Sequence, residues 1–172
     1  MKLRIAILFT SLILSSSFST ALPLTSAPVP QTGQASCWDT SGVSIPCAGT
    51  GQDGELQAGT PWPNPRFVAN ADQTVTDKAT GLIWSKDANP AAATKTWQQA
   101  LDYIKALNTG NYKGHNDWRL PNINELKSLV NLGQPALSSW LNLQGFSNVQ
   151  PDAYWASTLS VSGPNPGIVY MN

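Results

Sequence analysis

Residues 117–121 read Asp-Trp-Arg-Leu-Pro and place an acid, a large aromatic ring and a base side by side. In a carbohydrate subsite, the ring of Trp118 would stack on a sugar face while Asp117 and Arg119 bind hydroxyl groups. In the structural alternative, Trp118 is a core residue and Arg119 binds backbone carbonyls or a carboxylate. Pro121 would then end a strand-like segment, and Glu125 would pair with Arg119 or cap the following helix. We favour the structural interpretation of this corner.

Side chains that could catalyse a reaction are sparse in this chain. Glu125 is a candidate general acid or base, but no second carboxylate stands at a recognisable glycosidase spacing. His115 is the only histidine, which argues against a zinc site. No G-x-S-x-G element supplies a nucleophile for it. We therefore predict that the protein is not an enzyme and holds no cofactor.

Short acidic motifs leave calcium open as an alternative. Residues 150–152 read Gln-Pro-Asp, the calcium- and sugar-binding triplet of galactose-type C-type lectins. The Trp-Asn-Asp that follows the triplet in those proteins is permuted here and lies upstream, at residues 116–118. Residues 53–55 and the pair Asp72 and Asp77 could also offer oxygen ligands. Neither has EF-hand spacing, so turn formation is the preferred interpretation.

The seven tryptophans fall into two groups. Those in segments with a regular apolar pattern are predicted core residues: Trp84, Trp97, Trp118 and Trp155. Those among polar or Pro-rich neighbours are better candidates for exposed binding platforms, although packing beneath loops is the commoner fate of such rings: Trp38, Trp62 and Trp140. Trp62 and Trp140, together with Asp152, are the candidate ligand-binding residues.

Two helices are well signalled. Thr96 is a good N-cap with Gln99 as its capping-box partner, and apolar residues follow at helical spacing up to a stop at residues 108–110. The second helix is expected to begin at the cap residue Asn122, with the glutamate three residues later reaching back to the cap amide. Its apolar face predicts an end at residues 132–133.

The predicted strands are short and surround these helices, which indicates an α+β domain with small mixed or antiparallel sheets. Two strand pieces, residues 66–68 and 74–76, flank a turn. Residues 81–85 are an apolar run typical of a buried strand. Residues 154–158 and 167–171 are expected to form strands of a small sheet.

Residues 1–21 have the pattern of a secretory signal peptide. Lys2 and Arg4 precede an apolar run at residues 5–14, which is too short to span a bilayer comfortably, and small residues follow at 19–21. An uncleaved membrane anchor is the alternative. Removing the leader would leave eight basic against ten acidic groups, a net charge of −2. With no basic stripe, nucleic acid is not expected as a partner.

The two cysteines, Cys37 and Cys47, are most simply joined in one disulfide in an exported protein. Closing so short a loop should stabilise it by roughly 2–3 kcal/mol. The chain then divides into a flexible linker at 22–36, a disulfide-bearing Gly/Pro-rich lead-in at 37–65 and a domain at 66–172.

Three segments together resemble the Lcl C-terminal domain family: residues 117–126, the upstream segment 74–84 (Thr-Val-Thr-Asp-Lys-Ala-Thr-Gly-Leu-Ile-Trp) and the downstream segment 154–158 (Tyr-Trp-Ala-Ser-Thr). The lead-in also resembles a segment that often precedes this domain, so the resemblance covers residues 37–172. Members of the family usually continue through further strands, and their lack here would leave a sheet edge unpaired.

The resemblance implies a C-type-lectin-like fold and a role rather than a reaction. It suggests an exported, non-catalytic recognition domain that binds glycans or surface proteins and acts as an adhesin in the periplasm, at the cell surface or outside the cell. The alternative is a structural or assembly module of an envelope or surface complex, with an oligomer as one form. The similar fold of formylglycine-generating enzymes brings no catalytic cysteine, because Cys37 and Cys47 precede the matching region.

Overall fold

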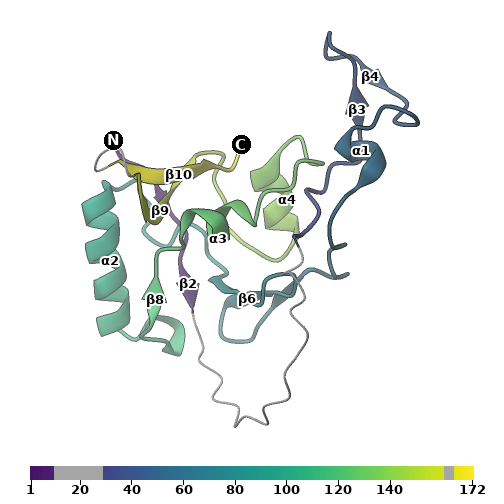
Figure 1. Ribbon diagram of the computed structural model, residues 1–172. Coiled ribbons are helices and arrows are strands. Elements are labelled where there is room, and N and C mark those ends of the chain that lie inside the picture. Colours follow the sequence, from purple (N-terminus) through teal and green to yellow (C-terminus); the bar gives the residue numbers. More distant parts are fainter. Residues whose placement is uncertain (10–28, 161–164) are drawn as a thin grey trace, which may run out of the picture.

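The computed structural model describes residues 1–9, 29–160 and 165–172 of this α+β protein (Figure 1). Short strands and helices are interspersed along the chain, and the strands form small sheets, as the sequence predicts. Within the described ranges, no helix combines the length and apolar character needed to cross a membrane.

The larger sheet has the strand order β5-β6-β7-β2-β8, and neighbouring strands are antiparallel. The predicted hairpin is confirmed, with its strands joined by a turn in which the Asn70 N–H donates to the Thr74 carbonyl (2.8 Å). The strands are β5 (Phe67–Ala69), β6 (Thr74–Asp77), β7 (Ile83–Ser85), β2 (Leu8–Phe9) and β8 (Trp118–Arg119). A strand from the N-terminus therefore lies between two strands that come much later in the chain.

The smaller sheet is built on β9 (Ala153–Leu159). It pairs antiparallel with β10 (Pro166–Tyr170) and parallel with β1 (Arg4–Ile5). Both predicted C-terminal strands are thus confirmed. The first residues of the predicted leader contribute a strand to each sheet, and residues 10–28, which include the predicted cleavage positions, lie outside the described part of the chain.

Helix α2 (Trp97–Thr109) begins where the sequence predicts. The Gln99 N–H donates to the Thr96 hydroxyl (3.3 Å), and the Thr96 N–H donates to the Gln99 side chain (3.0 Å). Ala100 and Ile104 are buried on its inner face. A 3₁₀ turn, η1 (Tyr112–Gly114), then leads the chain into β8.

Helix α3 (Ile123–Lys127) has the predicted cap at Asn122, but it is shorter than expected. Continuing it to residues 132–133 would need the Leu132 N–H to reach the Ser128 carbonyl. Instead, that carbonyl accepts a hydrogen bond from Arg66 (2.6 Å), and the Leu132 N–H donates to the Thr32 carbonyl (2.9 Å). Helix α4 (Leu137–Leu143), which we did not predict, follows.

The lead-in forms a small projection at one side of the molecule (Figure 1). Its elements are β3 (Cys37–Trp38), β4 (Ser44–Ile45) and a single-turn helix, α1 (Asp53–Leu56), which is a second helix the sequence did not predict. The predicted disulfide between Cys37 and Cys47 is present. The Glu55 carboxylate accepts hydrogen bonds from the loop amides of Gly49 (2.6 Å) and Gly51 (2.7 Å), which lower its pKa.

Replacing both Cys37 and Cys47 by serine should loosen the lead-in while leaving the main sheets intact. The expected local cost is roughly 2–3 kcal/mol, because the ring that the bridge closes is short. Amide hydrogen exchange checks this result. Faster exchange at residues 37–56 with unchanged exchange in β6 and β7 is expected, whereas global unfolding would show that the bridge supports the whole fold.

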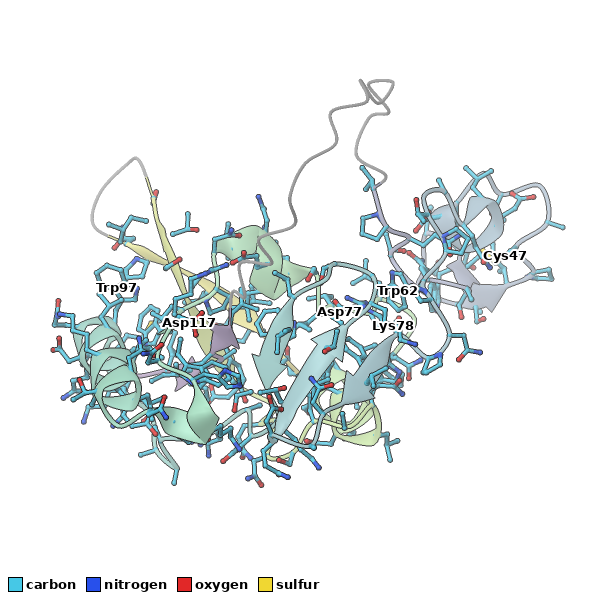
Figure 2. All side chains as sticks on the ribbon, turned by 90° about the horizontal axis from the view of Figure 1, so that it is seen from below. Cys47, Trp62, Asp77, Lys78, Trp97 and Asp117 are labelled. Atoms are coloured by element: carbon cyan, nitrogen blue, oxygen red, sulfur yellow. A yellow bond between two sulfur atoms is a disulfide. The ribbon has the colours of Figure 1, made fainter. Side chains whose placement is uncertain are left out.

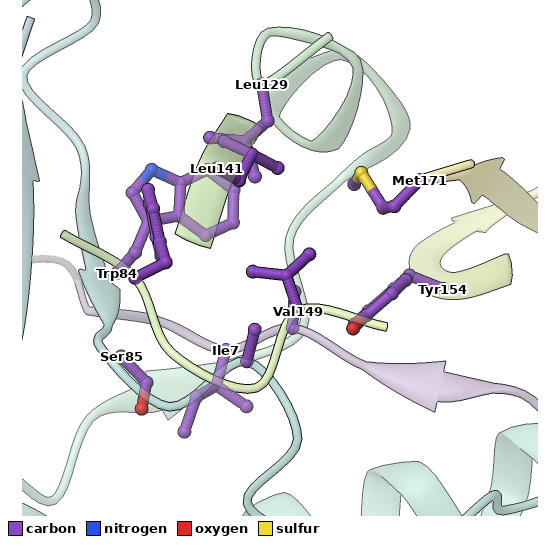
Figure 3. Close-up of a pocket in the computed structure, with 11 residues that line it drawn as sticks. Ile7, Trp84, Ser85, Leu129, Leu141, Val149, Tyr154 and Met171 are labelled. Atoms are coloured by element: carbon purple, nitrogen blue, oxygen red, sulfur yellow. The ribbon is translucent and has the colours of Figure 1, made fainter. Parts of the chain in front are cut away.

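The core consists of two clusters of buried residues that share the N-terminal segment. The first surrounds Trp84 and Leu126 and encloses a cavity of about 20 Å³, whose wall includes Ile7 and Met171 (Figure 3). The second lies beneath α2, around Trp118 and Trp155. Residues 3–8 supply side chains to both clusters.

Candidate functional site

Trp118 is part of the core and not a sugar platform. Its side chain is 2% exposed, and its Nε1 donates to the Tyr112 carbonyl (2.8 Å). Its backbone is held by the Asn108 side-chain amide, which both accepts from and donates to residue 118 (2.8 Å each). A shallow hollow of about 380 Å³ lies beside it and α2, but so little of the indole is exposed that it offers no stacking face.

Arg119 and Glu125 form the predicted partnership at the corner. Two hydrogen bonds of 2.7 and 2.6 Å join the guanidinium to the carboxylate. Glu125 also accepts the Asn122 N–H (2.8 Å), which completes the capping box of α3. The Arg119 bond, followed by the Asn122 amide, lowers the pKa of Glu125 against the opposing effect of burial. A general acid needs the opposite shift.

Because the Arg119 side chain is 37% exposed and that of Glu125 is 18% exposed, Arg119→Met should cost only about 1 kcal/mol. A cycle of Arg119→Met, Glu125→Gln and the double variant should show positive coupling, measured by urea unfolding. Since the folded-state pKa of Glu125 is lowered, this contribution is present above the unfolded pKa and is lost as the pH falls through the folded value. Additive single variants at pH 7 would show that the pair does not interact.

The oxygen-rich motifs are occupied by protein partners. The buried Asp77 binds Arg66, and its oxygens also accept the Ala79 N–H (3.0 Å) and the Thr80 hydroxyl (2.9 Å). Asp72 accepts the Thr74 hydroxyl (2.6 Å) and lies 3.0 Å from Nε2 of His115. Over the described ranges, no group of three or more His, Cys, Asp or Glu residues is placed to hold a metal.

Asp152 does not join the predicted aromatic site. Its carboxylate accepts the N–H of Ala153 (2.8 Å) and lies 3.6 Å from Nε of Arg4, a residue of the predicted leader. Trp155 is buried, and its Nε1 donates to the Lys95 carbonyl (2.9 Å). Asp152 of the Gln-Pro-Asp triplet and the nearby Trp155 therefore make contacts within the protein, at the start of β9.

Trp62 and Trp140 do come together, with ring centroids 6.1 Å apart. Trp140 packs against Phe67, with ring centroids 5.9 Å apart, and lines neither of the two hollows that adjoin Trp62. The guanidinium of Arg66 lies 4.4 Å from the centre of the Trp62 ring and 4.6 Å from that of Phe67. Trp62 is thus half-buried on a fixed support rather than free on a loop.

Two hollows meet at Trp62. The larger has a volume of about 530 Å³ and adds Lys127, Ser128 and Thr32 to an apolar wall that includes Val130 and Ile168. The smaller, about 160 Å³, adds Lys78 and several prolines. Figure 2 shows Trp62 and Lys78 near the base of the projection that carries Cys47. Neither lining contains a carboxylate. We call the two hollows together the Trp62 groove.

The Trp62 groove depends on contacts that sequence reasoning missed. Arg66 and Asp77 are joined by bonds of 2.9 and 2.8 Å across the β5–β6 hairpin, and Arg66 also holds Ser128. The one signal in the sequence is the turn that begins at Asp77, where an acidic side chain can bond the backbone two residues later. That signal predicts the turn but does not point to Arg66.

Part of the predicted flexible linker forms one wall of the groove. The Gln31 N–H donates to the Thr60 carbonyl (3.1 Å), and the Thr60 N–H donates to the Val29 carbonyl (2.8 Å). The Thr32 hydroxyl donates to the Asp53 carboxylate. Since the Thr32 carbonyl also accepts the Leu132 N–H (2.9 Å), the described end of this segment bridges the lead-in and the domain.

Comparison with known proteins supports the resemblance that the motifs indicate. Residues 73–171 match the family model of the Lcl C-terminal domain, and the lead-in lies outside the match. No curated protein and no solved structure matches the chain. Because the matched region covers more than half of its length, the chain belongs to the Lcl C-terminal domain family.

Proposed function

We propose that the protein is an exported, non-catalytic recognition domain that binds glycans at the cell surface through the Trp62 groove. A half-exposed indole flanked by hydroxyl, amide and ammonium groups suits a sugar, which presents an apolar face and a ring of hydroxyls. The observation that carries the proposal is the position of Trp62 between two hollows without a carboxylate. The disulfide is consistent with export, and membership of the family favours a surface-associated role.

The engaged carboxylates support a role without catalysis. Glu125 and Asp77 are each held by an arginine. The bond from Arg119 lowers the pKa of Glu125, which makes this carboxyl group a poor proton donor near neutral pH.

Glycan arrays followed by calorimetry on the exported protein, with and without Ca²⁺, test the proposal. Saturable binding is expected, and Trp62→Ala should weaken it by about tenfold or more, or about 1.4 kcal/mol. Because Trp62 also supports Arg66, Lys127→Gln and Lys78→Gln serve as variants that leave the core untouched. Trp38→Ala and Lys105→Gln, which lie outside the groove, are the matched controls. Absence of binding to any glycan in both conditions, or binding that ignores all groove variants, would refute it.

A structural or assembly role is the second candidate, and the projecting lead-in favours it. Trp38 (40% exposed), Val43 (59%) and Leu56 (63%) are apolar side chains left open on this small unit. Exposed apolar groups gathered on a projection suit contact with another protein. Sedimentation and pull-down of the wild type and of the Trp38→Ser/Leu56→Ser variant discriminate the recognition role from the assembly role. A wild-type protein that is monomeric and captures no envelope protein would speak against assembly and leave recognition as the role.

A further inference from the structure

The N-terminal segment, residues 3–8, is buried along almost its whole length. Leu3, Ile5, Ala6, Ile7 and Leu8 are each between 0 and 7% exposed. Alternation of buried and exposed side chains is missing, which is typical of a strand covered on both faces. This segment is also the start of the apolar run that predicts a leader. The same residues therefore fit both the pattern of a signal peptide and the pattern of a buried strand. A chain from which the signal peptide has been removed no longer contains that strand.

The backbone of this segment is bonded on every side. Leu8 lies opposite Trp84 of β7 and opposite Arg119 of β8, so β2 separates these two strands. The Ser85 N–H donates to the Ile7 carbonyl (3.1 Å). Leu3 and Lys95 exchange a pair of backbone bonds of 2.7 and 2.9 Å. Cleavage after residue 21 would remove the segment, and its backbone partners in β7, in β8 and at Lys95 would all lose these contacts.

The side chains show what kind of strand fits the site. Leu3, Ile5 and Ile7 belong to the cluster beneath α2, whereas Ala6 and Leu8 belong to the cluster around Trp84. Ile7 also lines the small cavity beside Val149 and Tyr154 (Figure 3). The one charged side chain, Arg4, bonds Asn89 (3.1 Å) and approaches Asp152. The space that residues 3–8 occupy therefore suits a short run of aliphatic residues with one basic residue near its start.

From these contacts we infer that the exported protein contains a strand-acceptor groove between β7 and β8, with β9 as its continuation. Its occupant is an apolar β-strand of another protein chain, bound by strand addition. The inference rests on the proposed export, since removal of the leader empties the groove. Unpaired β7 and β8 edges beside an exposed core are a strong site for such pairing.

The test uses protein exported from a bacterial host, with its N-terminus fixed by intact mass. The probe is a synthetic peptide with the sequence of residues 1–9 and a C-terminal lysine tail for solubility. The control peptide carries Ile5→Asp and Ile7→Asp and is otherwise identical. Saturable binding of the first peptide is expected, with a higher melting temperature and roughly tenfold slower amide exchange in β7 and β8. The control peptide should have no effect.

The other outcomes also decide the matter. A processed chain that folds only when the wild-type peptide is added supports the groove. A processed chain whose β7 and β8 amides are already protected, and which ignores the peptide, overturns it. So does a processed chain that stays unfolded with either peptide. An N-terminus at Met1 overturns it, because the leader is then retained and fills the groove, and the glycan experiment, which uses no peptide, reports separately on the Trp62 groove.

Discussion

Arg66→Met should lower the free energy of unfolding by about 3–5 kcal/mol, because it breaks a buried ion pair from one side. Arg66 is 5% exposed and Asp77 is fully buried. The guanidinium donates twice to that carboxylate and once to the Ser128 carbonyl. Its removal leaves a buried carboxylate without its counter-charge and frees a carbonyl near the end of α3. Urea unfolding followed by tryptophan fluorescence measures the loss.

Arg119→Met is the matched control for Arg66→Met. It removes the same side chain from a pair with similarly short bonds (2.7 and 2.6 Å against 2.9 and 2.8 Å), but that pair is partly exposed and its loss should cost only about 1 kcal/mol. The comparison contrasts a buried with a partly exposed arginine–carboxylate pair, and the Arg66 variant additionally loses the bond to the Ser128 carbonyl and the packing on Trp62 and Phe67. Equal decreases in the free energy of unfolding for the two variants would contradict the conclusion that burial makes the Arg66–Asp77 ion pair the more important one.

Arg66 also ties the Trp62 groove to the fold. Its guanidinium packs against the rings of Trp62 and Phe67 while bonding β6 and the residue after α3. An arginine can do this because its planar group bonds along its edge and stacks on its faces. The variant should therefore weaken ligand binding at the groove along with stability, whereas Lys127→Gln should affect binding alone.

Local signals were sufficient to predict the starts of α2 and α3 and the corner between β8 and α3. Thr96 with Gln99, and Asn122 with Glu125, are capping boxes whose partners stand three residues apart, so the sequence contains the whole interaction. The same holds for Arg119, which needs only to reach Glu125 across one turn. Interactions of short sequence separation are the ones that a pattern of residues can specify.

Long-range partners explain what sequence reasoning missed. Past the end of α3, the Ser128 carbonyl accepts from Arg66, 62 residues earlier in the chain, and the Leu132 N–H donates to the Thr32 carbonyl instead of continuing the helix. Helix α4 has no side-chain cap at Ala136, so nothing local marks its start. An apolar run such as residues 3–8 fits a leader and a buried strand equally well, because hydrophobicity without periodicity does not distinguish them.

Trp118→Ala should destabilise the domain by about 3–5 kcal/mol, a large share of the 5–15 kcal/mol typical of a folded domain. The substitution empties the space beneath α2 and removes the donor to the Tyr112 carbonyl. It also removes the edge-on contacts of the ring with Tyr112 (5.9 Å) and His115 (5.7 Å). Thermal and urea unfolding should both report the loss.

Trp38→Ala is the control for this substitution, because that ring is 40% exposed on the lead-in and its loss should change stability by no more than about 0.5 kcal/mol. If Trp118 is structural, residual folded Trp118→Ala protein at low temperature should bind ligand with wild-type affinity, since the Trp62 groove does not include this ring. A variant with the wild-type melting temperature but without glycan binding would reverse the assignment. The Asp-Trp-Arg corner, with the hollow beside α2, would then become the better binding site.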